Sequence, residues 1–229
     1  MLKRIVQTLM VSLLLVLPVS VAVSATATQA ATKSTTLPTS PKLDASAAIA
    51  VDAKSGQVLF EQNADQALPI ASMTKMLTAY IILTKIKQGQ LKWEQTTKPD
   101  VAIYKLSQNK DLTNVPLQAD GQYTVRELFQ AMMIASANDA AMMLANLVAG
   151  SQKNFVDLMR QQVNQWGIQD AKIYSVSGLN NQYLSGETYP DSAADAENEM
   201  SAADVAIIAQ RLLSDYPEIL KTTKQAQFT

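Results

Sequence analysis

Residues 68–86, LPIASMTKMLTAYIILTKI, carry apolar side chains that would cover most of the circumference of a helix. A surface helix has an apolar stripe on one side, whereas a helix that is apolar nearly all round has to be enclosed by other elements. Pro69 precedes the stretch and Gly89 follows it, which are common positions for these residues at helix borders. The stretch therefore predicts a core helix sheathed by other helices.

A single ammonium group interrupts the most apolar part of this helix. Lys75 lies three residues after Ser72, and residues at this spacing share a helix face, so the amine and the hydroxyl can touch. Burial disfavours a charged lysine, and a downward shift of about 3–4 units from about 10.4 would bring its pKa near 7. Lys75 could then accept the proton of Ser72. The alternative is that Lys75 extends from the helix edge into water.

Two residue types are missing from the whole sequence. The 229 residues include no histidine and no cysteine, which excludes a Ser-His-Asp triad, cysteine nucleophiles, thiolate metal sites and disulfide bonds. A covalent mechanism would need Lys, Asp, Glu or Tyr as its base. The net charge is −1 with both signs interspersed, and no basic stripe indicates a nucleic-acid partner.

The N-terminal part differs in composition from the rest. Two basic residues, an apolar run and small residues predict a secretory signal peptide at residues 1–25, with an uncleaved membrane anchor as the alternative. Residues 26–43 are rich in Ser, Thr, Ala and Pro and predict a flexible linker. The working part, residues 44–229, is therefore expected outside the cytoplasm.

Helices are expected to dominate the middle of the chain. Thr124 and Glu127 form a capping-box pattern, so a helix should begin here and continue through VRELFQAMMIA. Serine, glycine and proline residues punctuate the apolar runs that follow. These runs predict helices at residues 139–150, 151–167 and 202–216.

Strands are expected toward both ends. Two β-like runs flank the tetrapeptide KSGQ at residues 54–57, which suits a hairpin turn. Residues 171–182 should form a strand or an extended segment, and residues 220–229 should begin a strand. Residues 90–120 are polar and are expected to be irregular.

A second polar group lies between two apolar helical runs. Ser136 and Asn138, separated by Ala137, could point a hydroxyl and an amide into a cleft. The alternative is that one of them is a helix N-cap, a common use of both residue types. Residues 107–110, SQNK, match the spacing of Ser72 and Lys75 but lie in a polar stretch without an apolar helix.

The two polar groups together resemble a known pattern. The S-x-x-K and S-x-N motifs, here 64 residues apart, occur with K-T-G in β-lactamases and penicillin-binding proteins. From about Ala47 to Phe228 the chain resembles serine D-alanyl-D-alanine carboxypeptidases, which are low-molecular-weight penicillin-binding proteins. The segments that carry the resemblance are VDAKSGQVLFEQNAD, LPIASMTKMLTAY, TVRELFQAMMIASANDAA, SVSGLN and MSAADVAIIAQRLL. It implies an α+β fold of the β-lactamase/transpeptidase type, with a helical subdomain and an antiparallel sheet.

The resemblance also implies a role for each motif residue. Ser72 would be the nucleophile that forms an acyl-enzyme and Lys75 the base that activates it, while the N–H of Ser72 would supply half of an oxyanion hole. Ser136 would relay protons toward the leaving amine, and Asn138 would hold the substrate amide. The substrate would be the D-Ala-D-Ala end of peptidoglycan stem peptides, with β-lactams as covalent inhibitors. No cofactor or metal is implied, and the place of action would be the cell wall or the outer face of the cytoplasmic membrane.

One motif of the family has no counterpart. A K-T/S-G strand should follow the Ser136 region by about a hundred residues, beyond Thr229. The letters KSG at residues 54–56 match, but they precede Ser72 at a predicted turn and are rejected. The sheet is therefore expected to be incomplete, without the family's C-terminal β-domain and membrane anchor, and this 229-residue form is expected to catalyse inefficiently.

Three alternatives remain. A β-lactamase of the same fold needs an additional glutamate near the ester, and Glu187, Glu197 and Glu199 all lack the E-x-x-x-N setting of class A enzymes. A non-catalytic secreted binding protein would use Ser72 and Lys75 only as core and cap residues. A Ser-Lys signal peptidase would take its dyad from separate segments. The acidic stretch 187–200 is expected to be a solvated loop, because its carboxylates lack the spacing of a metal-binding loop.

Overall fold

The computed structural model describes residues 41–184 and 186–227, so the predicted signal peptide and nearly all of the predicted linker lie outside the described residues. The helices are α1 (Lys75–Lys87), α2 (Val101–Ser107), α3 (Val125–Ile134), α4 (Asn138–Ala149), α5 (Gln152–Gln165), α6 (Ala202–Asp215) and α7 (Ile219–Thr223). The strands are β1 (Ala48–Val51), β2 (Val58–Gln62), β3 (Leu68–Pro69), β4 (Thr96–Thr97), β5 (Tyr123–Thr124) and β6 (Glu199–Met200). Two 3₁₀ turns, η1 (Ala71–Thr74) and η2 (Asn181–Tyr183), complete the described part.

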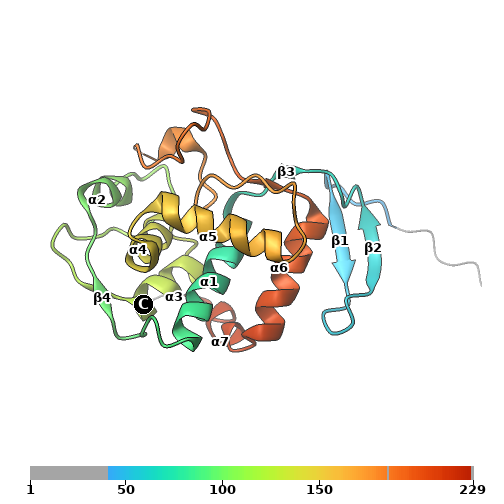
Figure 1. Cartoon of the computed structure of the whole chain (residues 1–229), viewed down its shortest axis with the longest axis horizontal. Coiled ribbons are helices and arrows are strands. Elements are labelled where there is room, and N and C mark those ends of the chain that lie inside the picture. The colour runs from blue at the N-terminus through green and yellow to red at the C-terminus, as the bar shows by residue number, and fades with distance from the viewer. Residues whose placement is uncertain (1–40, 185, 228–229) are drawn as a thin grey trace, which may run out of the picture. The chain divides into compact units, whose positions relative to one another are not determined.

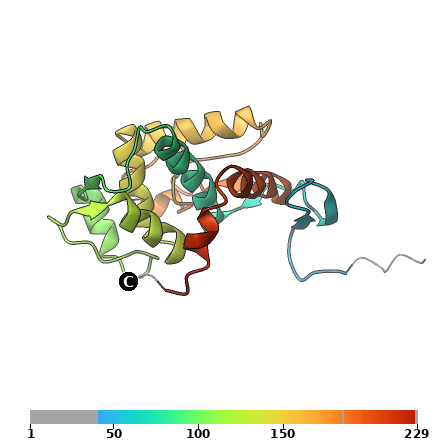
Figure 2. The same ribbon diagram turned by 90° about the horizontal axis from the view of Figure 1, so that it is seen from below.

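Helix α1 is the core helix that the sequence predicts. It contacts α3, α4, α5 and α6, and Figures 1 and 2 show these helices arranged around it. Its buried apolar residues are Leu77, Ala79, Ile81, Ile82 and Leu83. One detail differs from the prediction, because the chain enters α1 through η1, so Ser72 lies in a 3₁₀ turn and Lys75 is the first α-helical residue.

The predicted helix borders α3 to α6 are confirmed within a few residues, and side chains explain most of them. Thr124 and Ser201 each form a capping box, while the Ser151 hydroxyl accepts a hydrogen bond from the Asn154 N–H. Gly150 ends α4 in the left-handed conformation, with φ of 78°, which favours glycine. These borders fix where the chain reverses between packed helices.

The strands form three separate two-stranded antiparallel sheets in the described residues. The largest is the predicted hairpin of β1 and β2, and β1 also packs against α6. Its turn is held by Asp52, whose carboxylate accepts hydrogen bonds from the backbone N–H and the hydroxyl of Ser55, both 2.7 Å long. The predicted α+β class with antiparallel strands is thus confirmed.

Two local predictions are wrong. Residues 90–120 contain α2, which Asp100 caps by accepting from the Ile103 N–H at 2.8 Å. The strand predicted at 220–229 is replaced near its start by α7, which packs against α3 and buries Ile219. Its threonines favour a strand, but burial of apolar surface against a neighbouring helix decides the conformation.

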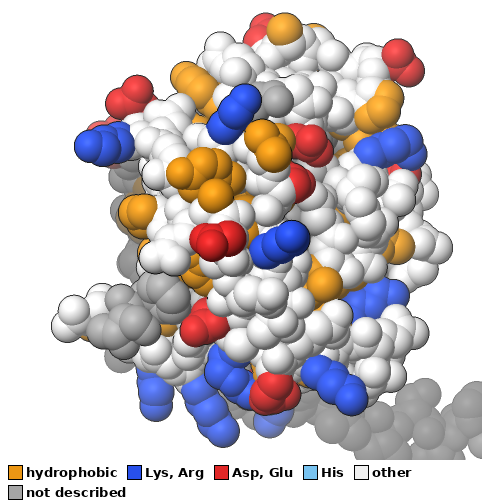
Figure 3. All heavy atoms as spheres, turned by 90° about the vertical axis from the view of Figure 1, so that its left-hand side faces the viewer, with side chains coloured by type: hydrophobic (Ala, Val, Ile, Leu, Met, Phe, Trp, Pro, Cys, Tyr) orange, Lys and Arg blue, Asp and Glu red, His pale blue; other side chains and the backbone are white. Residues whose placement is uncertain are grey.

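The described surface carries charges of both signs. Figure 3 shows Lys, Arg, Asp and Glu side chains scattered over the face at the left-hand side of Figure 1. No helix in residues 41–184 and 186–227 combines the length and apolar character needed to span a bilayer.

Candidate active site

The predicted contact between Ser72 and Lys75 exists in the structure. Lys75 is buried, with 3% of its surface exposed, while Ser72 in the preceding turn is exposed. The Lys75 amine Nζ donates a hydrogen bond to Ser72 Oγ over 2.9 Å. The arrangement therefore offers an accessible hydroxyl with a water-excluded amine directly behind it, and the alternative of a lysine extended into water is wrong.

Three acceptors surround the Lys75 amine. Besides Ser72 Oγ, Nζ donates to Asn138 Oδ1 at 2.8 Å and to the Ser177 carbonyl oxygen at 2.9 Å. An ammonium has three N–H donors and no acceptor, so the charged form is fully satisfied here. The neutral amine has two N–H donors and one lone pair. It can keep its bonds to Asn138 and Ser177 and turn the lone pair toward the hydroxyl of Ser72.

The surroundings of this amine lower its pKa toward neutral pH. Burial lowers the pKa of Lys75 from its ordinary value to about 8, and the nearby Asp139 carboxylate acts in the opposite direction. The shift is smaller than the one the sequence predicts, because the sequence argument did not include Asp139. With a pKa of about 8, roughly a tenth of Lys75 is neutral at pH 7.

Asn138 lies at the junction of α3 and α4. Its backbone N–H and its side-chain Nδ2 both donate to the Thr113 carbonyl oxygen, at 2.9 and 2.8 Å. With Nδ2 turned to Thr113, Oδ1 faces Lys75. The N-cap of α4 is Ala137, without a side-chain cap, so the capping alternative for Asn138 and Ser136 is wrong.

Ser136 lies two residues before Asn138 in the same junction. It is half-buried and has a φ of 56°, in the left-handed region that serine rarely adopts. No partner among the described residues forms a hydrogen bond with its hydroxyl, which leaves this group available to a ligand. Hydrogen bonds thus connect Lys75 to both Ser72 and Asn138. Ser136 forms no such bond with them but lies two residues from Asn138, in the same junction of α3 and α4.

The similar motifs elsewhere do not form a site. The hydroxyl of Ser107 donates to the Tyr104 carbonyl oxygen at 2.7 Å within α2, and Lys110 is exposed. The sequence KSG at residues 54–56 forms the turn of the hairpin. Spacing alone therefore does not distinguish a catalytic pair from a structural serine.

A segment without a motif completes the site. Thr78 Oγ1 donates to the Val176 carbonyl oxygen at 2.6 Å, next to the Ser177 carbonyl that accepts from Lys75. Gly178 has a φ of 84°, and a Cβ there would overlap the Ala71 carbonyl oxygen. The sequence SVSGLN contributed to the resemblance, but a backbone carbonyl carries no residue signature that would reveal its role.

Asn198 is a second residue that sequence reasoning missed. Its Nδ2 donates to Thr74 Oγ1 and the Ser175 carbonyl, at 2.9 and 2.8 Å, and its Oδ1 accepts from the N–H groups of Tyr174 and Ser175. Because Asn198 is fully buried, the prediction of a solvated loop is wrong at this position. The amide fastens the segment around Ser175 to the start of α1.

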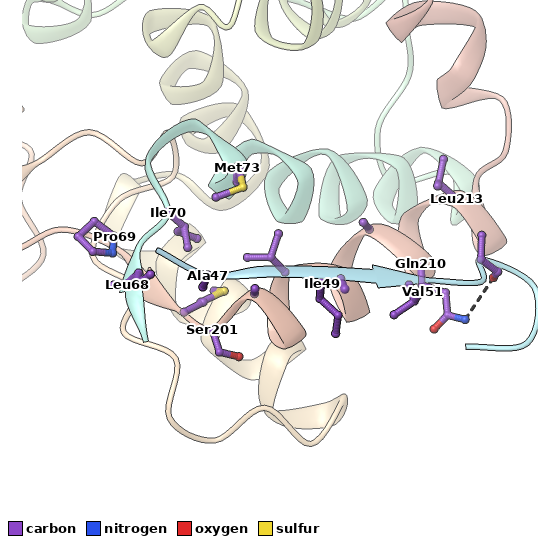
Figure 4. A pocket seen from close by; sticks show the side chains of 16 residues that line it. Ala47, Ile49, Val51, Leu68, Pro69, Ile70, Met73, Ser201, Gln210 and Leu213 are labelled. Atoms are coloured by element: carbon purple, nitrogen blue, oxygen red, sulfur yellow. Dashed lines mark hydrogen bonds between the residues drawn. The ribbon is translucent and has the colours of Figure 1, made fainter. Parts of the chain in front are cut away.

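An apolar pocket begins one residue from Ser72 but does not include the site. It has a volume of about 480 Å³ and lies between β1, residues 68–73 and α6 (Figure 4). Met73 lines it, whereas Ser72, Lys75, Ser136 and Asn138 do not. In the described residues no group of three or more carboxylates is placed to hold a metal ion.

The chain belongs to the D-alanyl-D-alanine carboxypeptidase family Peptidase_S11, whose profile matches residues 32–229. D-alanyl-D-alanine carboxypeptidase DacA of Escherichia coli strain K12 is 34% identical over 198 residues, which cover 85% of this chain and 45% of that protein. The matched part of the chain thus covers slightly less than half the length of this relative.

Solved structures agree in fold. The peptidoglycan synthesis regulatory factor (PBP3) of Streptococcus pneumoniae superimposes with a TM-score of 0.79 and 41% identity, over 82% of this chain and 53% of that one. Penicillin-binding protein D2 of Listeria monocytogenes in its cefotaxime-bound form gives a TM-score of 0.67 and 27% identity, over 81% of this chain and 69% of that one. The fold is that of penicillin-binding proteins, as the sequence resemblance implies.

Proposed function

We propose that this chain carries the acylation machinery of a serine-type D-alanyl-D-alanine carboxypeptidase, which removes the terminal D-Ala from peptidoglycan stem peptides through an acyl-enzyme. The contact of 2.9 Å between the exposed Ser72 hydroxyl and the buried Lys75 amine carries the proposal. Membership of the D-alanyl-D-alanine carboxypeptidase family supports the proposed substrate class.

In the first step, neutral Lys75 takes the hydroxyl proton of Ser72 while the oxygen attacks the carbonyl carbon of the penultimate D-Ala. Backbone N–H groups in the first helical turn, including that of Ser72, stabilise the oxyanion that forms. The new ammonium on Lys75 retains two acceptors, Asn138 Oδ1 and the Ser177 carbonyl. Proton transfer therefore does not leave a buried cation without hydrogen-bond partners.

In the second step, the C–N bond breaks and the terminal D-Ala leaves as an amine after receiving one proton. Lys75 holds the proton that Ser72 released, and the hydroxyl of Ser136 relays it to the leaving nitrogen. The second N–H of Asn138 Nδ2 is available to the substrate carbonyl, since one is used by Thr113. Water then cleaves the ester, which releases the shortened peptide and returns a proton to Ser72.

β-lactams are the second class of ligand in this proposal. Their strained amide presents the same type of carbonyl to Ser72, and the D2 protein of Listeria monocytogenes has been solved in cefotaxime-bound and ampicillin-bound forms. Because the proposed substrate is a cell-wall peptide, the proposed place of action is outside the cytoplasm, at the cell wall or the outer face of the cytoplasmic membrane.

Covalent labelling with a fluorescent penicillin tests the proposal. The purified chain should gain one fluorescent adduct, and peptide mapping should place it on Ser72. Ser72→Ala should abolish the label, while Ser107→Ala, which changes the other S-x-x-K serine, should retain it. Label that persists in Ser72→Ala would contradict the assignment. Release of D-Ala from a D-Ala-D-Ala peptide then tests turnover.

The lifetime of the adduct separates this function from that of a β-lactamase. A carboxypeptidase should keep the penicilloyl ester for minutes or longer, whereas a class A β-lactamase uses an additional glutamate to activate the water that cleaves it. Glu197 and Glu199 lie in the candidate part of the chain, and Glu199 instead pairs with Lys172 at 2.8 Å. Loss of the adduct within a second would favour the β-lactamase.

A further inference from the structure

Asp139 is a buried carboxylate that the proposed reaction does not use. It follows Asn138 in the first turn of α4 and has no exposed surface. Its Oδ1 accepts from the Ala140 N–H at 2.8 Å, and both oxygens approach the Val115 N–H, at 3.3 and 3.2 Å. The ion pairs of the described residues do not include it. A buried carboxylate is costly, so its position calls for an explanation beyond packing.

The first consequence of Asp139 is mechanical. Its bond to Val115 holds the loop of residues 113–115 against the start of α4, and Thr113 in this loop accepts both hydrogen bonds from Asn138. Those bonds set the orientation of the Asn138 amide. If the amide turned over, Nδ2 would face the Lys75 ammonium, and two donors would oppose each other.

The second consequence is electrostatic. The Asp139 carboxylate raises the pKa of Lys75 through its charge, and burial keeps this interaction from being screened by water. The position of Asp139 in the first turn of α4 also places its negative charge at the positive end of the helix dipole. The carboxylate thus stabilises a cation with which it forms no ion pair.

We propose that Asp139 is a positioning residue for the Lys75 amine. Through the loop of residues 113–115 it fixes the Asn138 oxygen that Lys75 contacts, and its charge balances the ammonium that forms when Ser72 gives up its proton. The second part rests on the proposed function, whereas the geometric part does not.

The first readout of the test is the pKa of Lys75, and the second is the rate of the reaction. The chain is labelled with ¹³C-lysine, the ε-methylene signal of Lys75 is assigned with Lys75→Arg, and its shift is followed from pH 5 to 11. In Asp139→Asn the pKa of Lys75 should fall below the wild-type value, since the opposing negative charge is gone. Asp100→Asn is the matched control, because it removes a carboxylate that caps α2 and should leave Lys75 unchanged.

The second readout is the rate of labelling by fluorescent penicillin as a function of pH. In Asp139→Asn, which keeps an oxygen acceptor for the Val115 N–H, the midpoint of the profile should move to lower pH with the amine. In Asp139→Ala, which also removes that acceptor, the rate above the midpoint should in addition fall at least tenfold, because the Asn138 oxygen is no longer held. Superimposable profiles and equal Lys75 titrations in Asp139→Asn and wild type would overturn the proposal. A wild-type chain that takes no label would contradict the proposed function alone, since the NMR titration still decides the role of Asp139.

The wild-type chain gives an independent test in case Asp139→Asn does not fold. Burial raises the pKa of Asp139 to about 6, so its charge disappears below this pH. The Lys75 signal should then show a second, smaller inflection near pH 6. A Lys75 signal without that inflection would remove the electrostatic part of the proposal.

Discussion

Raising the pH from 6.5 to 9.5 should accelerate acylation of Ser72 about 30-fold, with most of the increase below pH 8.5. The perturbation acts on one group, because only the neutral form of Lys75 can accept the proton of Ser72. Burial lowers the pKa of this amine to about 8. Asp139, with a pKa of about 6, is mostly ionised throughout this range.

The magnitude follows from the neutral fraction of the amine. With a pKa of about 8, about 3% of Lys75 is neutral at pH 6.5 and about 97% at pH 9.5. A lysine with an ordinary pKa of about 10.4 would instead give an increase of about 1000-fold over the same range, without a plateau. The two cases therefore differ both in total change and in the shape of the curve.

The assay is the second-order rate of labelling by a fluorescent penicillin, measured in buffers of constant ionic strength. Ser72→Ala provides the background at each pH, and the intact probe is quantified to correct for its hydrolysis in base. A rate that does not change with pH, or one that still rises tenfold per unit above pH 9, would refute the assignment of a buried amine as the base.

Three further predictions concern stability and packing. Asn198→Ala should destabilise the fold by about 3–4 kcal/mol in urea unfolding, because four polar groups lose a buried partner. The control Asn164→Ala, at an exposed residue of α5, should cost less than about 1 kcal/mol. Equal losses would contradict this reasoning. Gly178→Ala should lower the free energy of unfolding by about 2–4 kcal/mol and slow penicillin labelling, since the added methyl group overlaps the Ala71 carbonyl. Unchanged unfolding and labelling would show that this contact relaxes freely. The pKa of Lys75 is 10.5 in the unfolded chain and about 8 in the folded chain, so between these pH values the unfolded chain binds one more proton. The free energy of unfolding should therefore rise by about 3 kcal/mol from pH 8 to pH 10.5 relative to Lys75→Met. A difference between the two proteins that stays constant over this range would count against the lowered pKa.

The parts of the site that the sequence predicts are those set by local spacing. Ser72 and Lys75 are three residues apart in one apolar stretch, so their contact and the burial of the amine follow from a single helical turn. Helix borders such as Ser201 follow from capping chemistry in the same way. The roles of Ser136 and Asn138 as ligand-binding groups remain predictions.

The parts that the sequence did not predict depend on contacts between distant segments. Asn198 reads as one more polar residue of an acidic stretch, and only its meeting with Thr74, 124 positions away, makes it a buried connector. Asp139 follows the S-x-N motif directly, but its effect on Lys75 requires α1 and α4 to be packed. Residues 219–223 form the helix α7 and not the predicted strand, because Ile219 is buried where α7 packs against α3.

The three acceptors around the Lys75 amine belong to residues that are 3, 63 and 102 positions away from Lys75 in the chain. Two of these contacts join distant segments, so they exist only when the start of α1 is packed against α4 and the segment around Ser177. A half-formed chain therefore has a hydrated, protonated lysine and an ordinary, inert serine. Reactivity of Ser72 therefore requires the packed fold, so a penicillin adduct on Ser72 would count native molecules in a mixed population.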